Sequence, residues 1–266
     1  MSDLFSIEGK TAVVTGGSRG IGFMIAGELL RVGAGRVYIC ARRAEACDAA
    51  ARELSKFGEC VSVPCDVGSA EGVETLAAAV ESREDGLHIL VNNAGVAWGA
   101  DVDSHPAEQV DRVLHVNVTS IFAVTQRFLR LLRAAASAAD PARVINIGSI
   151  DGMAIPMSLN YGYSASKAAV HMLTRHLAHA LVQDHVNVNA IAPGLFPSRM
   201  TRWVFEGPGG PESAISAIPM RRAGTAEDIG GTAIYLASRA GAYLTGVVIP
   251  VAGGLATIES TRPPDE

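Results

Sequence analysis

The amino-acid sequence predicts an α/β protein built on one doubly wound parallel sheet of about seven strands, with helices on both faces. Three observations lead to this prediction. Short apolar runs that suit buried strands alternate along the chain with longer segments whose apolar residues recur at helical spacing. The first of these runs passes through a glycine-rich turn straight into a helical pattern. At 266 residues, the chain is long enough for one such domain with a sizeable core.

The glycine-rich turn lies in residues 11–22, which read TAVVTGGSRGIG. Its glycines Gly16, Gly20 and Gly22 connect a run of strand length to an amphipathic continuation. A strand that runs through glycines into a helix makes a site for a phosphate, because unpaired backbone N–H groups and the positive end of the helix dipole point at one spot. Glycine also lets the anion approach closely. The alternative is a turn with a purely structural role.

Composition excludes several classes of function. The chain is 48% hydrophobic and 18% charged, with a formal net charge of -5, as expected of a compact globule. This charge gives no basic field for nucleic acid or for an anionic membrane. The longest uncharged stretch, 240–258, is interrupted by four glycines and a proline, which suits a strand with flanking turns better than a membrane-spanning helix.

The amino terminus and the cysteines lead us to expect a cytoplasmic protein. The first ten residues carry Asp3 and Glu8 and run directly into the first strand, which is unlike a signal peptide. All four cysteines fall in the first quarter of the chain, without a C-x-x-C pair. Reduced, partly buried thiols are therefore expected.

Further strands and helices alternate along the rest of the chain. Apolar runs predict strands over 36–40, 61–65, 87–91, 144–149, 186–192 and 246–251. Helical spacing predicts helices over 45–57, from about residue 69, over 108–133 with a break near Asn117, over 161–183 and over 226–237. We expect one domain over 1–256 and a loose polar tail over 257–266.

Two arginines follow the second predicted strand. In a dinucleotide-binding fold, the residue about 20 positions past the glycine turn meets the adenosine ribose. An acid there would favour NAD, but this chain has Arg42 and Arg43. The planar guanidinium donates two parallel hydrogen bonds to a phosphate, so we predict NADPH in preference to NADH. The alternative is a pair of solvated arginines that open a helix.

A serine, a tyrosine and a lysine are the candidates for the chemistry. Ser149 ends a predicted strand, and ligands bind at the carboxyl ends of parallel strands, so its hydroxyl is expected in the same crevice as the glycine turn. Tyr163 and Lys167 lie four apart and so share one helix face. Tyr161 has an alanine at that spacing.

These motifs together resemble the short-chain dehydrogenase/reductase family. The turn reads Thr-Gly-x-x-x-Gly-x-Gly over 15–22, the fourth strand ends in Asn-Asn-Ala-Gly over 92–95, and Tyr163 and Lys167 match the Tyr-x-x-x-Lys motif. The resemblance covers residues 7–255, with every motif in order. It implies a Rossmann-like fold and hydride transfer between a nicotinamide and a carbonyl carbon.

The resemblance also implies roles for four residues. Tyr163 would give the carbonyl oxygen its proton, and the charges of Lys167 and of the oxidised nicotinamide would lower the high pKa of the phenol. Ser149 would hydrogen-bond the same oxygen. Asn117, a poor helix former, would kink its helix and hold a water in the proton path. Lys167 would also hold the nicotinamide ribose.

The cofactor contacts implied by the resemblance are spread over six segments. They are Gly16, Ser18, Arg19, Gly20, Ile21, Gly22, Arg42, Arg43, Asp66, Val67, Asn93, Ala94, Gly95, Tyr163, Lys167, Pro193, Gly194, Phe196 and Ser198. Asp66 has a second reading, as the cap of the helix that begins near Ser69. No metal is expected, because His171, His176 and His179 lie along one helix without a further ligand pattern.

A segment with apolar residues among glycines and prolines, about 196–222, resembles the substrate lid of the family and includes Met200, Trp203, Val204 and Phe205. Trp98, Met153 and Met157 either complete an apolar pocket or belong to the core. Ala252 stands where the family usually has an aspartate, which puts only a C-terminal contact in doubt.

Several runs, among them IAPGLFPSRMT near the lid, look closest to bacterial β-ketoacyl reductases of the kind linked to rhamnolipid precursors. A 3-oxoacyl group on acyl carrier protein or coenzyme A is thus the expected substrate. Another ketone or secondary alcohol, such as a polyketide, a steroid or a xenobiotic, remains an alternative, as does a cofactor-binding regulator or scaffold. The family is usually tetrameric, which implies a homotetramer.

Overall fold

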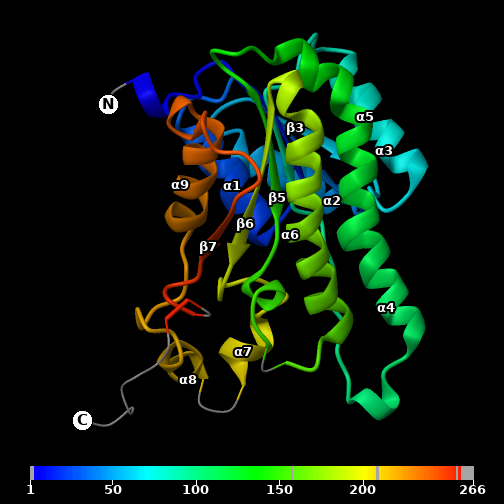
Figure 1. Cartoon of the computed structure of the whole chain (residues 1–266), viewed down its shortest axis with the longest axis vertical. Helices are drawn as coiled ribbons and strands as arrows, with labels where there is room; N and C mark the ends of the chain where they lie inside the picture. The colour runs from blue at the N-terminus through cyan, green and yellow to red at the C-terminus, as the bar shows by residue number, and fades with distance from the viewer. Residues whose placement is uncertain (1–2, 157, 208–209, 256, 259–266) are drawn as a thin grey trace.

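The computed structural model shows a single sheet of seven parallel strands in the order β3-β2-β1-β4-β5-β6-β7 (Figure 1). It describes residues 3–156, 158–207, 210–255 and 257–258. The strand order reverses between β1 and β4, which lie side by side in the middle of the sheet. The predicted fold class is confirmed.

The strands and main helices alternate along the chain. The strands are β1 (Thr11–Thr15), β2 (Arg36–Ala41), β3 (Cys60–Pro64), β4 (Ile89–Asn92), β5 (Ala142–Ile147), β6 (Val186–Pro193) and β7 (Val248–Val251). The helices are α1 (Gly20–Arg31), α2 (Ala44–Leu54), α3 (Ala70–Glu81), α4 (Ala107–Leu114), α5 (Ser120–Ala135), α6 (Tyr161–Leu181), α7 (Arg202–Glu206), α8 (Gly210–Ser216) and α9 (Ala226–Ala237).

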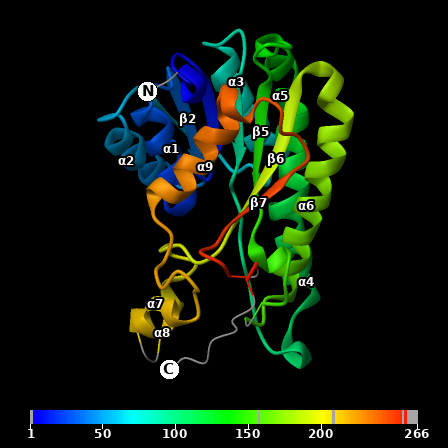
Figure 2. The same ribbon diagram turned by 60° about the vertical axis from the view of Figure 1, so that its left-hand side comes forward.

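Helices cover both faces of the sheet (Figure 2), and a hydrophobic cluster fills the space between helices and strands on each face. On one face, side chains of α1, α2 and α9 pack against β1, β2 and β6, with Ile25 and Leu236 fully buried. On the other face, α3, α5 and α6 pack against alternate residues of the same strands, with Phe128 and Leu76 fully buried. Successive strand residues point to opposite faces, so apolar runs buried on both sides form these strands.

Most predicted elements lie within a few residues of the observed ones, and the last helix matches 226–237. Two differ in a way that concerns the site. The predicted strand over 144–149 is β5 at Ala142–Ile147, so Ser149 lies beyond its end, in a turn. The helix expected over 45–57 is α2, which ends at Leu54 because Ser55 follows as its cap.

The lid residues form α7 and α8 beyond the carboxyl ends of the strands (Figure 1). The predicted tail lies outside the described residues from 259 onward. All four cysteines are unpaired thiols, with Cys40 and Cys47 buried. Within the part of the chain that is described, no helix is both long and apolar enough to cross a bilayer.

Candidate active site

The glycine turn forms a cradle at the start of α1. Gly16 and Gly20 have φ angles of 66° and 56°, a region that L side chains rarely adopt. A Cβ on Gly22 would lie 2.4 Å from Asn93 Nδ2 and 2.6 Å from the Gly16 carbonyl oxygen, so only glycine fits. Arg19 caps α1 without a side-chain hydrogen bond, which leaves the first backbone N–H groups of the helix without a cap. The cradle therefore suits an anion.

The end of β4 holds this cradle in place. Thr15 Oγ1 accepts hydrogen bonds from the backbone N–H groups of Asn93 (2.9 Å) and Ala94 (3.0 Å). Asn93 Nδ2 donates to the carbonyl oxygens of Thr15 (2.9 Å) and Gly16 (3.2 Å). The Asn93 side chain thus braces the glycine turn from behind, so a cofactor in the cradle would not meet this amide.

Four arginines gather beside the cradle: Arg19, Arg42, Arg43 and Arg199. Burial first, and then the charges of its three neighbours, lower the pKa of Arg19. Among the described residues, no carboxylate lies within ion-pair distance of any of the four. Such a group of unpaired guanidinium groups fits a phosphate on the adenosine ribose.

Arg199 is the site residue that the sequence prediction missed. It lies in the lid segment, far from Arg42 along the chain, and no spacing rule connects the two. The only sequence signal is its place next to Ser198, which the resemblance had assigned to the cofactor. Ser198 Cβ lies 3.4 Å from the position of a Cβ on Gly20, so the start of the lid rests against the cradle.

Ser149, Tyr163 and Lys167 meet at the carboxyl end of β5. Ser149 is 7% exposed and hydrogen-bonds Tyr163. Lys167, one helical turn after Tyr163 on α6, is 4% exposed, and its Nζ lies 5.5 Å from the centre of the Tyr163 ring. The same Nζ donates to the Ile147 carbonyl oxygen at 2.7 Å, which ties α6 to the end of β5. The structure therefore brings the three predicted side chains together.

Burial dominates the electrostatics of this trio. It raises the pKa of Tyr163 to about 12, with a smaller upward contribution from Asp151 and an opposing one from the Ser149 hydrogen bond. It lowers the pKa of Lys167 to about 8. Without a bound nicotinamide, burial thus outweighs the Ser149 hydrogen bond, and the pKa of the phenol lies above its usual value.

Asn117 lies in a π-helical segment, His115–Thr119, between α4 and α5. Its side chain is fully buried, accepts a hydrogen bond from the Val96 N–H (2.8 Å) and donates to the Val96 carbonyl (2.9 Å) and to Ser166 Oγ (2.9 Å). The predicted break near Asn117 is therefore a π-bulge, a feature often found at functional sites. The side chain joins the loop after β4 to α6.

The remaining predicted cofactor residues line the same edge. Ser18 belongs to the turn, and Ile21 to the first residues of α1. A Cβ added to Gly95 would lie 3.2 Å from Asn117 Oδ1. Pro193 is the last residue of β6. The side chains of Val67 and Phe196 are buried in the two hydrophobic clusters, and Phe196 also lines a cavity beside the site.

The structure rules out one role that the sequence suggested for Asp66, and it shows what surrounds Gly194. Asp66 does not cap α3, because the Ser69 side chain accepts from the Gly72 N–H and is itself the cap. Asp66 Oδ1 instead accepts from the Gly68 N–H at 2.9 Å and remains exposed beside the end of β3. Gly194 packs against Ala252, because a Cβ added to Gly194 would lie 2.8 Å from the Ala252 Cα. Ala252, which stands where the family usually has an aspartate, therefore makes a close contact with Gly194.

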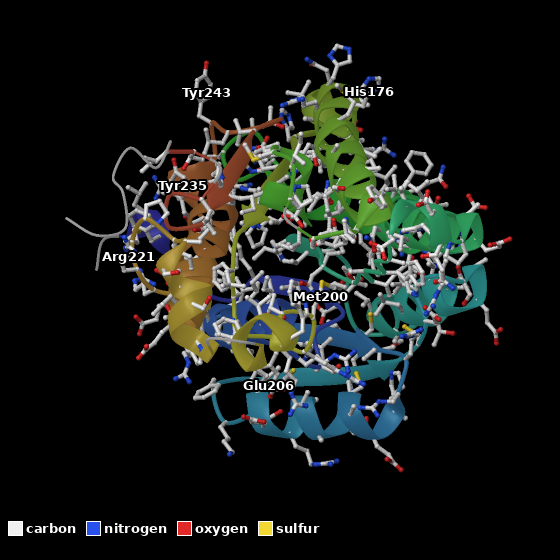
Figure 3. All side chains as sticks on the ribbon, turned by 90° about the horizontal axis from the view of Figure 1, so that it is seen from below. His176, Met200, Glu206, Arg221, Tyr235 and Tyr243 are labelled. Atoms are coloured by element: carbon white, nitrogen blue, oxygen red, sulfur yellow. The ribbon has the colours of Figure 1, made fainter. Side chains whose placement is uncertain are left out.

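Large apolar side chains surround the mouth of the site. Ile155 is 98% exposed and Trp203 66%, and Met153, Leu159, Met200 and Met220 are also exposed. Figure 3 views the molecule from this end, with Met200 and Glu206 labelled on the lid. Exposed apolar groups in such numbers on one end mark a binding surface. Trp98 packs edge-on against His105 at 4.7 Å, and Met157 lies outside the described residues.

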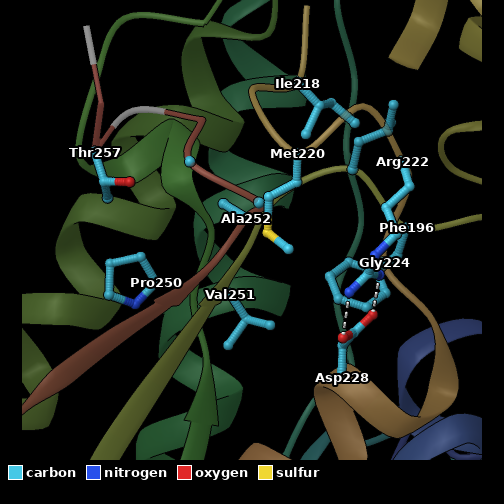
Figure 4. Close-up of a pocket in the computed structure, with 13 residues that line it drawn as sticks. Phe196, Ile218, Met220, Arg222, Gly224, Asp228, Pro250, Val251, Ala252 and Thr257 are labelled. Atoms are coloured by element: carbon cyan, nitrogen blue, oxygen red, sulfur yellow. Dashed lines mark hydrogen bonds and ion pairs between the residues drawn. The ribbon is translucent and has the colours of Figure 1, made fainter. Parts of the chain in front are cut away.

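A cavity of about 260 Å³ adjoins this mouth between the lid and the C-terminal end of β7 (Figure 4). Apolar side chains make most of its wall, among them Phe196, Ile218 and Met220. Arg222 and Asp228 close one side through two hydrogen bonds of 2.6 and 2.9 Å. Leu195, the residue that follows Gly194 in the chain, lines the cavity, whereas Tyr163 is not among the lining residues.

The three histidines of α6 do not converge. His171 is 5% exposed, and its pKa is lowered to about 4, mainly by burial. His176 and His179 lie on the exposed face of the helix. In the residues described, no group of three or more His, Cys, Asp or Glu side chains is arranged to hold a metal ion.

Residues 16–256 match the sequence pattern of the family described as Enoyl-(Acyl carrier protein) reductase. The rhamnolipids biosynthesis 3-oxoacyl-[acyl-carrier-protein] reductase of Pseudomonas aeruginosa is 52% identical over 254 residues, which are 96% of this chain and 99% of that protein. The short-chain dehydrogenase/reductase PhomF of Diaporthe leptostromiformis is 35% identical over 274 residues, with 95% and 93% covered.

A solved structure is also similar. The RhlG/NADP active-site complex of Pseudomonas aeruginosa superposes with a TM-score of 0.93 at 51% sequence identity, and the match covers 96% of this chain and all of that one. Family pattern, relatives and fold agree with the motifs at the carboxyl edge of the sheet. The chain is an oxidoreductase and belongs to the short-chain dehydrogenase/reductase family.

Proposed function

We propose that this oxidoreductase uses NADPH to reduce a ketone, and that the ketone is a 3-oxoacyl thioester on acyl carrier protein or coenzyme A. The observation that carries the reaction is the meeting of Ser149, Tyr163 and Lys167 at the carboxyl end of β5, at the same sheet edge as the glycine cradle. The product is the 3-hydroxyacyl thioester.

The residues around the cradle fit the cofactor. The uncapped start of α1 would receive the pyrophosphate, and the unpaired arginines would hold the phosphate of the adenosine ribose. Asp66, exposed beside the end of β3, would face the adenine. When bound, the nicotinamide supplies the hydride that is added to the carbonyl carbon. The NADP named in the structure of the Pseudomonas relative supports this choice.

The protein's own groups then handle the carbonyl oxygen. Ser149 donates a hydrogen bond to this oxygen as negative charge develops on it, and Tyr163 transfers its phenolic proton to complete the alcohol. A phenol with a pKa of about 12 is fully protonated at neutral pH, as a proton donor must be. Lys167 then stabilises the phenolate, and Asn117 would position the water that returns a proton.

The apolar surroundings support an acyl substrate. The exposed side chains of the mouth and the adjoining cavity offer an uncharged surface for a hydrocarbon chain. The similarity to a rhamnolipid 3-oxoacyl-[acyl-carrier-protein] reductase supports the thioester. We further propose that the protein is cytoplasmic, where free thiols stay reduced, and that it forms a homotetramer as the family usually does.

A substrate screen tests this function. NADPH consumption is followed with 3-oxoacyl thioesters of several chain lengths, with unrelated ketones of similar size, and with NADH in place of NADPH. The proposal predicts the highest kcat/KM for the thioesters and a clear preference for NADPH. Equal rates with unrelated ketones would remove the substrate assignment, and equal rates with NADH would remove the cofactor assignment.

A further inference from the structure

One carboxylate in the site has no part in the reaction described above. Asp151 lies two residues after Ser149, in the short helical turn Ile150–Gly152. Its backbone N–H donates to Ser149 Oγ at 3.1 Å, and its Oδ2 accepts from Asn160 Nδ2 at 3.2 Å. The side chain is half-buried, and the backbone N–H of the same residue contacts the Ser149 hydroxyl.

The turn that carries this carboxylate is packed closely against α6. A Cβ on Gly152 would lie 2.6 Å from the backbone of Lys167 and Ala168, so the turn sits directly on α6. The backbone of Gly152 also hydrogen-bonds His171, one turn further along the helix. The turn cannot shift without displacing the helix that carries Tyr163.

The carboxylate also lacks a counter-ion. No described Lys, Arg or His side chain lies within ion-pair distance of Asp151. Lys167 is the one cation whose charge acts on it, and it does so from beyond that distance. Burial raises the pKa of Asp151, while the Asn160 hydrogen bond and Lys167 lower it. A carboxylate without a salt bridge is therefore held two residues from Ser149, on the turn that Ser149 begins.

We propose that Asp151 is a specificity-determining residue that admits uncharged 3-oxoacyl esters and thioesters and rejects free 3-oxo acids. The inference rests on the proposed function. In a thioester the carbonyl group two positions from the ketone is neutral, whereas in the free acid that position is a carboxylate, whose two oxygens share a full negative charge. Two like charges in a partly buried site repel each other, because little water separates them. Discrimination by such repulsion needs no extra contact with the accepted substrate.

The charge of Asp151 also acts on the proton-transfer groups. The titratable groups that face Tyr163 and Lys167 are Asp151 from the turn and His171 from α6, while the π-helical segment contributes the neutral Asn117. Asp151 raises the pKa of both Tyr163 and Lys167. Removal of its charge should therefore move the alkaline limb of the pH profile to lower pH.

The test compares matched substrates. Acetoacetate, its ethyl ester and its N-acetylcysteamine thioester are reduced by the wild-type enzyme and by Asp151→Asn, which removes the charge and keeps the shape. Asp85→Asn, an exposed carboxylate at the opposite edge of the sheet, is the control. We expect the preference for ester over acid to fall on the order of tenfold in Asp151→Asn, because kcat/KM for the acid rises. The control should keep the wild-type preference.

A second variant guards against a folding defect. Asp151→Glu keeps the charge and should retain the preference for ester over acid, while thermal melts report whether each variant is folded. An unchanged preference in folded Asp151→Asn would overturn the inference and leave the proposed function intact. A wild-type enzyme that reduces neither ester nor thioester would overturn the proposed function and this inference with it.

Discussion

Lys10 and Lys167 are both buried, at 9% and 4% exposed, but they lie at opposite edges of the sheet. Lys10 precedes β1, and its Nζ is 2.7 Å from Asp140 Oδ1. Lys167 lies beside the end of β5, where its Nζ donates to a backbone carbonyl, and no described carboxylate is within ion-pair distance. A buried charge is costly unless it is paired, so the two lysines cannot have the same purpose.

The arginines and tyrosines repeat this contrast. At the amino edge, Arg36 pairs with Glu59 at 2.7 Å, and Tyr38 donates to Glu84 at 2.9 Å. At the carboxyl edge, Arg42 and its neighbours face no described carboxylate. Ion pairs stabilise the amino edge, whereas the arginines and the lysine without ion-pair partners at the carboxyl edge are free to bind a ligand or to take part in proton transfer. The difference teaches which edge is structural and which is functional.

The largest expected effect comes from the unpaired lysine. Lys167→Met removes the cation that stabilises the phenolate, so kcat for NADPH-dependent ketone reduction should fall on the order of 10³-fold. The matched variant Lys10→Met should keep the wild-type kcat per folded molecule. Steady-state assays on both variants measure the contrast, and equal losses of kcat would erase it.

The unpaired arginines should give the next largest effect. Replacing Arg42 and Arg43 with alanine removes charge-assisted hydrogen bonds to the ribose phosphate, so the Kd for NADPH should rise roughly tenfold to hundredfold. The Kd for NADH should hardly change. Arg127→Ala, whose guanidinium pairs with Glu74 and Glu81, is the control and should leave both constants unaltered. Fluorescence titration measures the Kd for each coenzyme. An equal rise in the Kd values for NADPH and NADH would contradict the prediction.

A stability effect is expected at the amino edge. Asp140→Asn leaves the ammonium of Lys10 without its counter-ion, and Arg143 loses a partner at the same time. The free energy of unfolding should fall by about 1–3 kcal/mol, with kcat unchanged in the folded enzyme. Urea denaturation measures this loss, and Asp85→Asn should show none. A drop in kcat without a loss of stability would reverse the assignment of the two edges.

The smallest effect concerns pH and stability. The pKa of Lys167 is about 8 in the folded protein and about 10.5 when exposed. Between these values the unfolded chain binds more protons, so the stability contributed at this position rises with pH. The advantage in stability of Lys167→Met over the wild type should therefore be constant below pH about 8 and shrink above it. Urea denaturation across this range checks the trend, which a constant difference would contradict.

Much of the fold is readable from local sequence. Apolar runs such as 36–40 and 186–192, and the glycine spacing of 16–22, fix strands and a turn through interactions among near neighbours in the chain. The Tyr163 to Lys167 spacing places both side chains on one helix face. These features depend on periodicity and backbone conformation, which the sequence displays directly.

The parts that escaped prediction depend on distant neighbours. Arg199 joins Arg42 only because the lid folds back over α1. Whether Asp151 has an ion-pair partner depends on the residues that the fold packs around it, which lie elsewhere in the chain. The raised pKa of Tyr163 reflects burial, which no residue type or spacing reveals. The sequence identifies the titratable side chains of the site, whereas their electrostatic environment depends on the tertiary structure.

The most direct test of the central claim is Tyr163→Phe, which removes only the phenolic hydroxyl. With NADPH and a 3-oxoacyl thioester, we predict that kcat falls on the order of 10³-fold, because the variant lacks the phenol that transfers the proton directly to the carbonyl oxygen. The Kd for NADPH should stay close to the wild-type value, since the arginines and the glycine cradle remain. An unchanged kcat in the folded variant would contradict the claim that Tyr163 protonates the carbonyl oxygen.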